Sequence, residues 1–529
     1  MSEAIKELLK YSLKKIKNRD DLEVAKRVIC KKYRLASILN SDILTEYRSL
    51  LISKKIVQNI LLEKILRKRA IRTMSGIAPV AVLTKAYPCP GTCVYCPHEK
   101  EVPTSYLSNE PAVMRAIRCG YDPYRQVILR LKALESNGHE PTKIEIIVIG
   151  GTWSYLPVKY KYWYILNCFK AANDYQKKKI NLDSTYRQNL SLANLKKILT
   201  QEQKKNESAK YKIIGLTLET RPDYITEQEL LEMRELGCTR VEIGAQVIDD
   251  RILKLNKRGH GVKEIIEATK LLKQFGFKVT YHLMPALPGA TPAKDLKMFA
   301  QLFSDERFQP DQIKFYPTVV VKGSLLYRWY KQGKYKPYSD RVLQALIIKC
   351  KALVPKYVRI IRLVRDIPGE SIVAGNKITN LRQVMQDRGV KCDCIRCREA
   401  KDRPIKNYQI NIQQYSASAG LEYFISADSL DGKILYGFCR LRIDQQSPIS
   451  SAIIRELHVY GELVSVGGQK KVQHSGLGKQ LLAQAEALAA KNKCFKITVI
   501  SGVGVRGYYR KLGYKLQGRY MNKSLIFIK

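Results

Sequence analysis

The chain has 529 residues, with 93 Lys and Arg against 48 Asp and Glu, which gives a formal net charge of +45. At roughly 150 residues a domain this length allows three or four domains, and the 45% of hydrophobic residues excludes a wholly disordered chain. No apolar run approaches the roughly 18 residues of a membrane span, and charges interrupt residues 1–20. We therefore expect a cytoplasmic protein with neither a membrane helix nor a secretory signal.

The N-terminal region, residues 1–75, combines apolar residues at helical spacing with an excess of basic residues. Residues 1–74 contain 19 basic and 8 acidic residues, and the run 64–69 contains four basic ones. Each Lys or Arg placed at a phosphate releases condensed counterions, so this region predicts a basic helical surface that binds a nucleic acid. A solvated helix face and a lysine-rich proteome remain the alternatives.

Residues 76–365 alternate short apolar runs with amphipathic stretches. The predicted strands are residues 144–149, 213–218, 240–243, 278–283 and 312–316, and helices are predicted at 227–236 and 262–275. Residues 156–210 are rich in Lys and Tyr and predict a helical excursion. Such β/α repetition is typical of a parallel sheet in an open or closed barrel, whose site lies at the carboxyl ends of the strands.

Three cysteines, Cys89, Cys93 and Cys96, precede these repeats with the spacing C-x3-C-x2-C. Three thiolates can hold three irons of a [4Fe-4S] cluster and leave the fourth iron without a protein ligand. An open iron can chelate the amino and carboxylate groups of S-adenosylmethionine (SAM), whose reductive cleavage gives a 5′-deoxyadenosyl radical. A zinc knuckle or unrelated thiols are the alternatives.

Glycine and charged residues recur where the predicted strands end. Gly150 and Gly151 allow close approach of a ligand to the backbone, and Glu219 and Arg221 offer a carboxylate for a ribose and a guanidinium for a carboxylate. Gln246 and Lys314 lie at the ends of later predicted strands. Because strand ends meet at one edge of a barrel, we expect these residues to bind SAM, with Lys314 as a catalytic residue.

Residues 366–405 lack clear periodicity and predict a linker. They contain a second triplet, Cys392, Cys394 and Cys397, in the pattern C-x-C-x2-C. In a reducing compartment such a triplet predicts three ligands of a structural zinc, with incidental thiols as the alternative. Cys238, Cys350 and Cys439 are candidates for the fourth ligand.

From about residue 406 to 529 the pattern predicts a mixed α/β domain. Strands are predicted at 433–443, 453–460 and 496–500, and helices at 478–491 and 506–512. The loop Gln473-x-x-Gly476-x-Gly478 before a helix is the acyl-CoA signature of the GCN5-related N-acetyltransferase fold, in which consecutive N–H groups converge on a pyrophosphate. The alternative is a glycine turn next to core tyrosines.

Two further segments complete this acyl-CoA pattern. Glu456, Leu457, His458 and Val459 resemble the strand whose free edge pairs with pantetheine amides. Residues 506–514, which contain Tyr508 and Tyr509, resemble the last helix of that fold, where a tyrosine contacts the CoA thiol. The predicted fold is thus α/β throughout: a radical-SAM partial (β/α) barrel preceded by a basic helical region and followed by a GCN5-related N-acetyltransferase domain.

From about residue 70 to 529 the chain resembles the catalytic subunit of Elongator, a family of tRNA wobble-uridine carboxymethyltransferases. The resemblance includes long motifs at residues 121–124, 219–224, 256–260, 455–461 and 499–504. It implies that acetyl-CoA loses a methyl hydrogen to the 5′-deoxyadenosyl radical and that the carbon radical adds to C5 of uridine 34. Hydrolysis from CoA then leaves 5-carboxymethyluridine in the anticodon stem-loop.

The resemblance also implies roles for individual residues. Cys89, Cys93 and Cys96 hold the cluster, and Lys143 matches a family lysine associated with acetyl-CoA. Residues 456–459 and Leu477, Gly478 and Lys479 match the CoA-binding segments. Tyr509, with Tyr508 beside it, matches the acetyl-CoA tyrosine, and we expect both tyrosines to be catalytic.

Two features differ from the eukaryotic subunits, which separate the first two cysteines more widely and lack the intact second triplet. Both favour an archaeal or bacterial type that works alone with an electron donor, so that a full Elongator assembly is not expected. The alternative function is that of a protein lysine acetyltransferase with a structural iron–sulfur cluster. That function would give no role to Glu219, Arg221 and Lys314. A non-enzymatic tRNA-binding protein is the third hypothesis.

Overall fold

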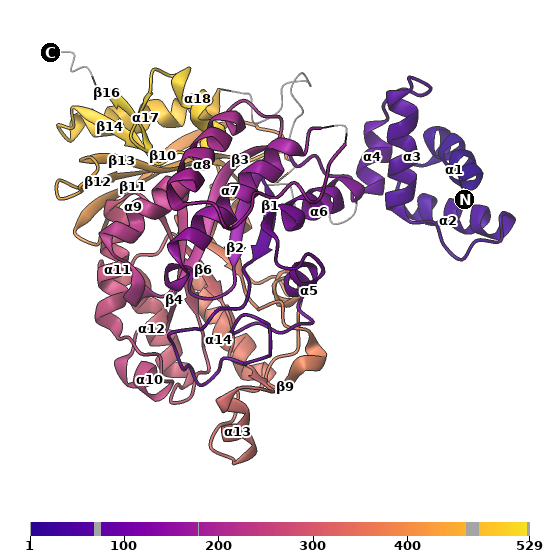
Figure 1. Cartoon of the computed structure of the whole chain (residues 1–529). Coiled ribbons are helices and arrows are strands. Elements are labelled where there is room, and N and C mark those ends of the chain that lie inside the picture. Colours follow the sequence, from indigo (N-terminus) through magenta and orange to yellow (C-terminus); the bar gives the residue numbers. More distant parts are fainter. Residues whose placement is uncertain (1, 68–75, 178, 402, 462–475, 526–529) are drawn as a thin grey trace.

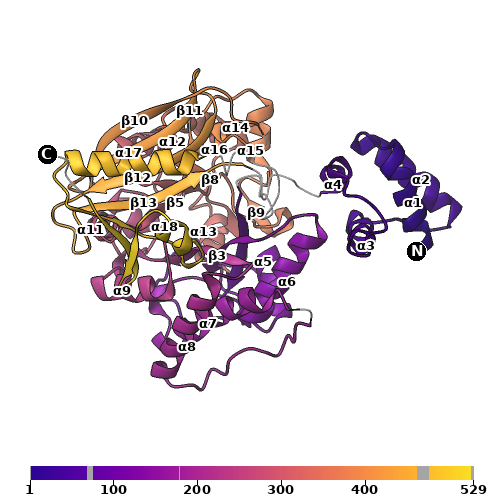
Figure 2. The same ribbon diagram turned by 90° about the horizontal axis from the view of Figure 1, so that it is seen from above.

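The computed structural model describes residues 2–67, 76–177, 179–401, 403–461 and 476–525. It contains a helical N-terminal region, a parallel sheet surrounded by helices, and a second sheet with its own helices (Figures 1 and 2). None of the helices in these ranges has the length and apolar character needed to cross a membrane. The predicted α/β fold class is confirmed.

The N-terminal region contains four helices packed around a separate core of aliphatic side chains (Figure 1). They are α1 (Ser2–Lys15), α2 (Arg19–Lys32), α3 (Asn40–Ile52) and α4 (Ile60–Leu66). Asn18 and Asp21 form a capping box that fixes the start of α2. Two contacts link the region to the body: Arg48 Nη1 donates to the Glu135 carbonyl at 2.8 Å, and Arg67 Nε donates to that of Gly138 at 3.1 Å.

The central sheet has seven strands, and each neighbouring pair runs parallel. In sheet order they are β1 (Ala78–Leu83), β2 (Lys143–Ile149), β3 (Lys212–Thr220), β4 (Arg240–Gln246), β5 (Lys278–Leu283), β6 (Gln312–Phe315) and β8 (Arg359–Arg362). The edge strands β1 and β8 are not paired, so the barrel is open. The five predicted strands are confirmed.

Helices cover the outer face of this sheet (Figure 1). The helices of this part of the chain are α5 (Pro111–Arg118), α6 (Pro123–Ser136), α7 (Val158–Asp174), α8 (Leu192–Asn206), α9 (Glu227–Leu236), α10 (Asp250–Leu255), α11 (Val262–Gln274), α12 (Pro292–Ser304) and α14 (Asp340–Ala352), while α13 (Leu325–Lys331) projects beyond the barrel. The predicted helical excursion corresponds to α7 and α8. Sequence analysis did not predict β1 or β8; β8 has the sequence Arg-Ile-Ile-Arg, too short for a clear period.

The segment predicted to be a linker contains short elements of its own. Strand β9 (Ile372–Ala374) pairs antiparallel with β7 (Val320–Val321), and α15 (Leu381–Asp387) and α16 (Ile395–Arg398) follow. The amide of Ile395 donates to the Val358 carbonyl at 2.9 Å, which ties α16 to the residues before β8. The segment therefore packs against the barrel.

The C-terminal domain is built on a second seven-stranded sheet with α17 (Leu477–Lys491) and α18 (Arg506–Arg510). In sheet order its strands are β10 (Tyr408–Ala417), β11 (Gly420–Ser429), β12 (Leu435–Ile443), β13 (Ala452–Val459), β14 (Lys496–Val499), β16 (Tyr520–Ser524) and β15 (Lys515–Gln517). Only the β13–β14 pair is parallel among these neighbours. Sequence analysis located β12, β13 and β14 but not the others.

The C-terminal domain packs against the amino ends of the parallel strands. A Cβ added at Gly502 would lie 1.9 Å from the Ile214 carbonyl oxygen, so the backbone there lies directly on the start of β3. The buried Arg455 of β13 donates to Asp311 of the barrel at 2.8 Å and to Glu422 of β11 at 2.9 Å. These paired buried charges fix the second sheet to the barrel end opposite the predicted SAM site.

Candidate active site

One cavity of about 690 Å³ extends along the inside of the open barrel and reaches the C-terminal domain. Many predicted site residues line it: Cys89, Cys93, Cys96, Gly151, Glu219, Arg221, Gln246, Lys314, Glu456, Leu457, His458 and Tyr509. The first triplet and strand β13, which sequence analysis assigned to two separate ligands, therefore border the same space.

Other predicted residues of the described ranges lie outside this cavity wall. They are Lys143, Gly150, Val459, Gly476, Leu477, Gly478, Lys479, Tyr508 and the second cysteine triplet. Gln473 lies outside the described residues, as do Lys68 and Arg69 of the basic run. The predicted residues thus fall into two groups: those that line the cavity and those that lie outside its wall.

Two arginines surround the buried Cys93 of the first triplet. Arg258 Nη1 donates to Cys93 Sγ at 3.3 Å, and its Nη2 donates to the Gly244 carbonyl at 2.7 Å. A hydrogen bond from the Cys96 thiol, with the Arg258 and Arg221 guanidinium groups, lowers the pKa of Cys93 to about 4. Sequence analysis quoted Arg258 within a motif without giving it a role.

The geometry of the first triplet differs from that of a site for a single ion. The three sulfur atoms of Cys89, Cys93 and Cys96 do not all lie within 4.8 Å of one another, whereas sulfurs around one zinc lie about 3.8 Å apart. Arg221 also lies at the cysteine loop, because a Cβ added at Gly91 would meet its Nη1 at 2.2 Å. This Nη1 is buried and, within the described ranges, has no hydrogen-bond partner. The loop thus offers three thiols that do not form one compact group, together with a guanidinium nitrogen that is free to donate.

Glycines close the loop after β2. Gly150 has φ +132°, and a Cβ there would lie 2.2 Å from Thr84 Oγ1, so only glycine fits against the residue that follows β1. The neighbouring Gly151 lines the cavity. Gly150 therefore positions the strand end, and Gly151 borders the site.

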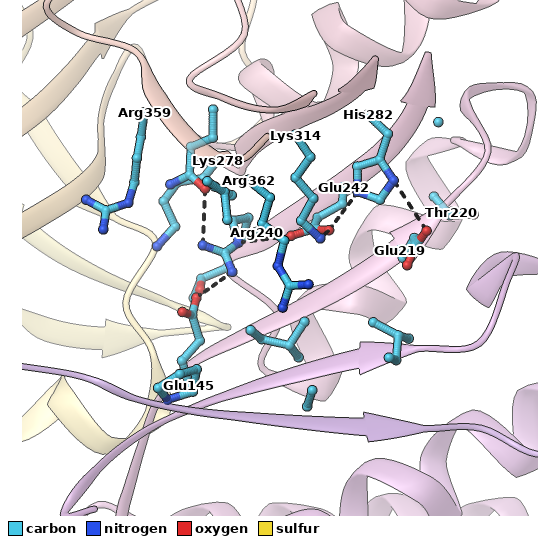
Figure 3. A pocket seen from close by; sticks show the side chains of 18 of the residues that line it. Glu145, Glu219, Thr220, Arg240, Glu242, Lys278, His282, Lys314, Arg359 and Arg362 are labelled. Atoms are coloured by element: carbon cyan, nitrogen blue, oxygen red, sulfur yellow. Dashed lines mark hydrogen bonds and ion pairs between the residues drawn. The ribbon is translucent and has the colours of Figure 1, made fainter. Parts of the chain in front are cut away.

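A chain of buried charges crosses the middle of the cavity (Figure 3). Glu242 of β4 accepts hydrogen bonds from Lys314 and, at 2.8 Å, from Nε2 of His282, whose Nδ1 lies 3.4 Å from Glu219. Further along, Arg240 Nη2 lies 3.0 Å from Glu145. The chain joins Glu219, at the cysteine end, to residues near the C-terminal domain.

The protonation states in this network follow from its contacts. Burial alone would raise the pKa of Glu242, but Lys314 and His282 outweigh it and hold the pKa far below its ordinary value. Burial would lower the pKa of Lys314, yet Glu242 reverses this and raises it. Lys314 is consequently a cation at neutral pH and can donate hydrogen bonds or balance charge, but it is not a base.

Sequence analysis missed His282, which belongs to the predicted strand 278–283. Its signal was a titratable residue near the carboxyl end of a predicted strand, but the partners Glu242 and Glu219 come from other strands. Their convergence depends on the strand order, which spacing along the chain does not reveal.

The acyl-CoA segments lie together at the other end of the cavity. Glu456 accepts from Arg440 Nε at 3.0 Å and lies 3.7 Å from Nζ of Lys278 of the barrel, which ties β13 to β5. Tyr509 is buried and lines the cavity, whereas Tyr508 is 41% exposed. A Cβ on Gly478, in the first turn of α17, would lie 3.0 Å from Tyr508 Oη. Tyr508 therefore packs against the first turn of α17.

Lys143 is the first residue of β2 and is aligned with Lys212 of β3. Burial lowers its pKa. A Cβ added at Gly504 of the C-terminal domain would lie 2.7 Å from Cβ of Lys212. Lys143 therefore lies one strand away from the contact between the two domains, although it does not line the cavity.

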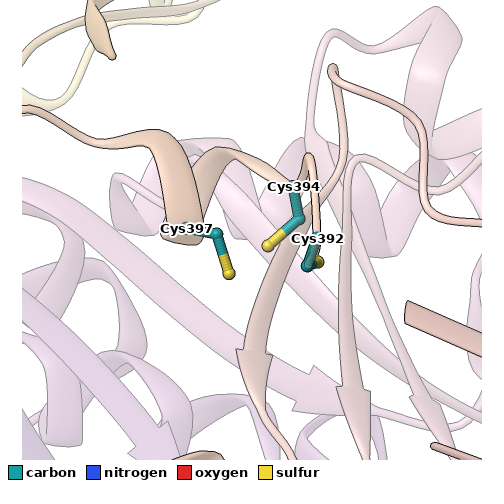
Figure 4. A group of neighbouring side chains, drawn as sticks. All are labelled: Cys392, Cys394 and Cys397. Carbon is teal, nitrogen blue, oxygen red and sulfur yellow. The ribbon is translucent and has the colours of Figure 1, made fainter. Parts of the chain in front are cut away.

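The second triplet forms a compact group at the start of α16 (Figure 4). The sulfurs of Cys392, Cys394 and Cys397 all lie within 4.8 Å of one another, and hydrogen bonds from the two neighbouring thiols lower the pKa of Cys394. In the described part of the chain no fourth His, Cys, Asp or Glu ligand atom meets this distance for all three. None of Cys238, Cys350 and Cys439 belongs to the group.

Three protein families match separate parts of the chain. The Radical SAM superfamily matches residues 86–302, the Radical_SAM C-terminal domain residues 310–389, and the Acetyltransferase (GNAT) family residues 392–514. The first match covers the cysteine loop and β2–β5, and the last covers β10–β14 and α18. The cavity therefore lies between segments that match two different enzyme families.

Similar proteins span nearly the whole chain. A tRNA uridine(34) acetyltransferase of Dehalococcoides mccartyi is 43% identical over 87% of this chain and all of its own length. The human Elongator complex protein 3 is 39% identical over 87% of this chain and 86% of its own. The solved structure of the archaeal Methanocaldococcus infernus Elp3 with an N-terminal deletion superposes with a TM-score of 0.70 at 37% identity, covering 85% of this chain and 99% of that one.

Proposed function

This chain belongs to the family of the tRNA uridine(34) acetyltransferases and Elongator complex protein 3, and we propose that it makes 5-carboxymethyluridine at uridine 34 of tRNA. It is a radical-SAM, acetyl-CoA-dependent transferase that modifies the wobble uridine. The proposed reaction replaces the hydrogen at C5 of the uracil ring with the methyl carbon of the acetyl group. One methyl hydrogen goes to the 5′-deoxyadenosyl group derived from SAM, and the C5 hydrogen leaves as a proton while one electron returns to the reductant. Acetyl-CoA supplies the two carbons, and water releases the product from CoA.

One observation carries this proposal: the cysteine triplet and the acyl-CoA strand border one cavity. A reaction that removes hydrogen from the acetyl group needs SAM and the thioester within reach of each other. Two separate pockets would suit two independent activities. The shared cavity favours a single reaction that uses both ligands.

The residues of the first triplet fit a [4Fe-4S] cluster with an open iron. Cys89, Cys93 and Cys96 would hold it, since all three border the cavity, they do not form a compact three-sulfur group, and the Cys93 thiol ionises readily. When bound, the cluster supplies the electron that cleaves SAM to a carbon-centred radical. Arg258 stabilises the Cys93 thiolate, and the buried, unpartnered Nη1 of Arg221 can donate to a carboxylate.

Residues around the middle of the cavity orient the reactants. Glu219 can accept from the hydroxyl groups of a ribose, while His282 holds its carboxylate in place. Lys314, kept cationic by Glu242, can donate to a carbonyl oxygen that enters the cavity. Because Glu242, His282 and Lys314 are buried, their hydrogen bonds form in a low-dielectric space, where they are stronger.

The C-terminal domain binds the thioester in this proposal. The N-terminus of α17 receives the pyrophosphate of CoA, with Gly476, Leu477, Gly478 and Lys479 at the contact and Gln473 in the preceding loop. The free edge of β13 binds the pantetheine amides, and Tyr508 and Tyr509 contact the thioester. Lys143, near the domain contact, binds acetyl-CoA from the barrel side.

The second triplet is proposed to hold a structural zinc. Its three close thiols provide three corners of a tetrahedron, and α16 lies between the barrel and the C-terminal domain. Arg398 of the same helix donates to the backbone carbonyl of Lys356, before β8, and to the carboxylate of Asp428 in β11. A metal here would hold the connection between the two domains in one conformation.

The partners follow from the same proposal. The chain acts in the cytoplasm on the tRNA anticodon stem-loop, takes electrons from a separate donor, and works without the other Elongator subunits. The exposed basic residues of α1–α4 bind the tRNA backbone at a distance from the cavity. The acidic tRNA is the polyanion that the net charge of +45 predicts.

An omission experiment tests the proposed function. Reconstituted enzyme is incubated without oxygen with tRNA, SAM, reductant and acetyl-CoA, and the tRNA nucleosides are analysed by mass. We expect 5-carboxymethyluridine only when all components are present. Acetylation of protein lysines that persists without SAM, with no change in the tRNA, would favour the protein lysine acetyltransferase instead.

A further inference from the structure

A basic and aromatic projection lies beside the cysteine loop and has no role in the chemistry described above. It comprises residues 322–338, here called the α13 finger, and Figure 1 shows its helix projecting beyond the rest of the barrel. Five exposed basic residues lie on it, and it contains no Asp or Glu. The basic residues are Lys322, Arg328, Lys331, Lys334 and Lys336.

The base of the finger is fixed to the loop of the first triplet. The amide of Leu326 donates to the carbonyl of Val94 at 2.8 Å, between Cys93 and Cys96 in sequence. The amide of His98 donates to the carbonyl of Gly323. Gly323 has φ +81°, and a Cβ added there would lie 2.9 Å from the His98 carbonyl oxygen. A group bound on the finger is therefore held at a fixed distance from the cysteines.

The returning arm of the finger is equally well anchored. Tyr335 Oη donates to the Ala286 carbonyl at 2.7 Å, and Tyr338 Oη donates to Asp295 at 2.8 Å. These bonds hold the turn around Gln332 and Gly333 away from the body, where Lys331 and Lys334 are exposed. The charges are thus presented on a rigid support.

A second cavity, of about 560 Å³, opens along this arm. Its wall includes Tyr330, Tyr335, Tyr338 and Lys336 of the finger, Asp340 just after it, and Ala374 and Gly375 from the segment after the barrel. A hollow with aromatic side chains beside exposed lysines matches the needs of an unpaired nucleotide, whose base stacks on a ring and whose phosphate meets a cation.

We propose that the α13 finger is a docking surface for single-stranded RNA, where the nucleotides flanking the target uridine bind with one base on Tyr330. This inference rests on the proposed function, which brings the anticodon loop to the cavity. The lysines at the tip, Lys331 and Lys334, contact the phosphates. Docking there holds the neighbouring nucleotides while the target uridine enters the barrel.

The chemistry of the surface favours RNA over an acidic protein segment. Residues 322–338 contain five cations and no carboxylate, and Asp340 is the one acidic residue among the described residues in the wall of the hollow. This excess of positive charge suits an RNA strand, which carries one negative charge per nucleotide. The tyrosine-lined hollow would add nothing for an acidic peptide but gives a planar base a stacking surface. The base of the finger contacts the cysteine loop, which borders the active-site cavity.

A pair of matched charge reversals tests the proposal in the full-length enzyme. The finger variant is Lys331→Glu with Lys334→Glu, and the control is Lys491→Glu with Lys496→Glu, two exposed lysines of the C-terminal domain. The binding of an anticodon stem-loop RNA is measured over a range of salt concentrations. We expect the finger variant to bind about ten-fold more weakly, with a salt slope lower by about 0.7 for each phosphate that is no longer neutralised, and the control to match the wild type.

Substitution of the tyrosine separates stacking from charge. Tyr330→Ala should weaken RNA binding about five-fold or more, while Tyr330→Phe, which keeps the ring, should bind as the wild type does. A photoreactive uridine placed next to the target position should crosslink to the finger. For each variant, cleavage of SAM in the presence of acetyl-CoA and a free uridine analogue reports whether the cysteine site is intact.

The outcomes distinguish this inference from the proposed function. If the wild type modifies tRNA but the finger variant binds RNA with an unchanged affinity and salt slope, the docking surface is refuted and the function stands. Equal losses in the finger variant and in its control would also refute it. If the wild type modifies no tRNA, the proposed function fails, whereas crosslinking of Tyr330 to RNA would still support the surface.

Discussion

The two cysteine triplets contain the same number of thiols but lie in opposite kinds of environment. Cys89, Cys93 and Cys96 are spread along a loop that borders the main cavity, whereas Cys392, Cys394 and Cys397 form a compact group away from it. The guanidinium groups of Arg221 and Arg258, from loops after β3 and α10, flank the first triplet, and the second packs against the residues before β8. The triplet expected to be catalytic and the triplet expected to be structural thus differ in the spacing of their sulfurs, in their access to the cavity and in the charges beside them.

The largest effect should follow from a change in the first triplet. Cys93→Ser removes the ligand that Arg258 stabilises, so we expect SAM cleavage and tRNA modification to fall to background, with RNA affinity nearly unchanged. Iron content and product nucleosides are the measurements. Cys30→Ser, in the separate N-terminal core, is the matched control and should keep full activity. Substantial turnover by Cys93→Ser would contradict the catalytic role assigned to the first triplet.

A change at the acyl-CoA end should stop the same reaction without touching either triplet. Gly478→Glu places bulk and negative charge next to Tyr508 and the helix N-terminus, so we expect acetyl-CoA to bind about 100-fold more weakly. Gln484→Glu adds the same charge on the exposed face of α17 and should bind acetyl-CoA normally. Calorimetry measures the affinity, and iron and zinc contents should stay constant; a loss of metal would mean that the variant is misfolded.

The positive charge beside the first triplet is a further difference from the second triplet, and it can be tested at Arg258. Arg258→Gln keeps a hydrogen-bonding side chain but removes the positive charge beside Cys93, so we expect activity to fall about ten-fold and the cluster to be harder to reduce. Turnover and the reduction potential are measured together. An unchanged potential would show that Arg258 serves only to support the loop.

The smallest effect on turnover should come from the second triplet. Cys394→Ser should release zinc and lower the free energy of unfolding by about 2 kcal/mol or more, while activity per folded molecule changes less than two-fold at low temperature. Metal analysis and thermal unfolding are the measurements. Loss of SAM cleavage in a folded, zinc-free protein would contradict the structural role.

Sequence patterns located the β/α repeats and both triplets because these signals are local. Apolar runs such as 144–149 and 213–218 became β2 and β3, and the fold class followed from their alternation with helices. The exposed strand β10 and the short β8 gave no such signal, since the first is mostly polar and the second has four residues.

The network of Glu242, His282 and Lys314 shows why part of the site escaped sequence analysis. Each residue lies on a different strand, and only the order of the sheet brings them together. The shared cavity has the same origin, because it depends on the C-terminal domain packing on the amino ends of the barrel strands. Motifs indicated two ligands, but packing between domains is what places both sites along one space.

Deuterium transfer tests the central claim most directly, namely that both ends of the cavity take part in one reaction. Reduced, reconstituted enzyme is incubated with tRNA, SAM and acetyl-CoA deuterated at the methyl group, and the 5′-deoxyadenosine and tRNA nucleosides are analysed by mass. The account predicts that one deuterium appears in 5′-deoxyadenosine and that two remain in the carboxymethyl group. Formation of 5′-deoxyadenosine without deuterium, while the tRNA is modified, would contradict it.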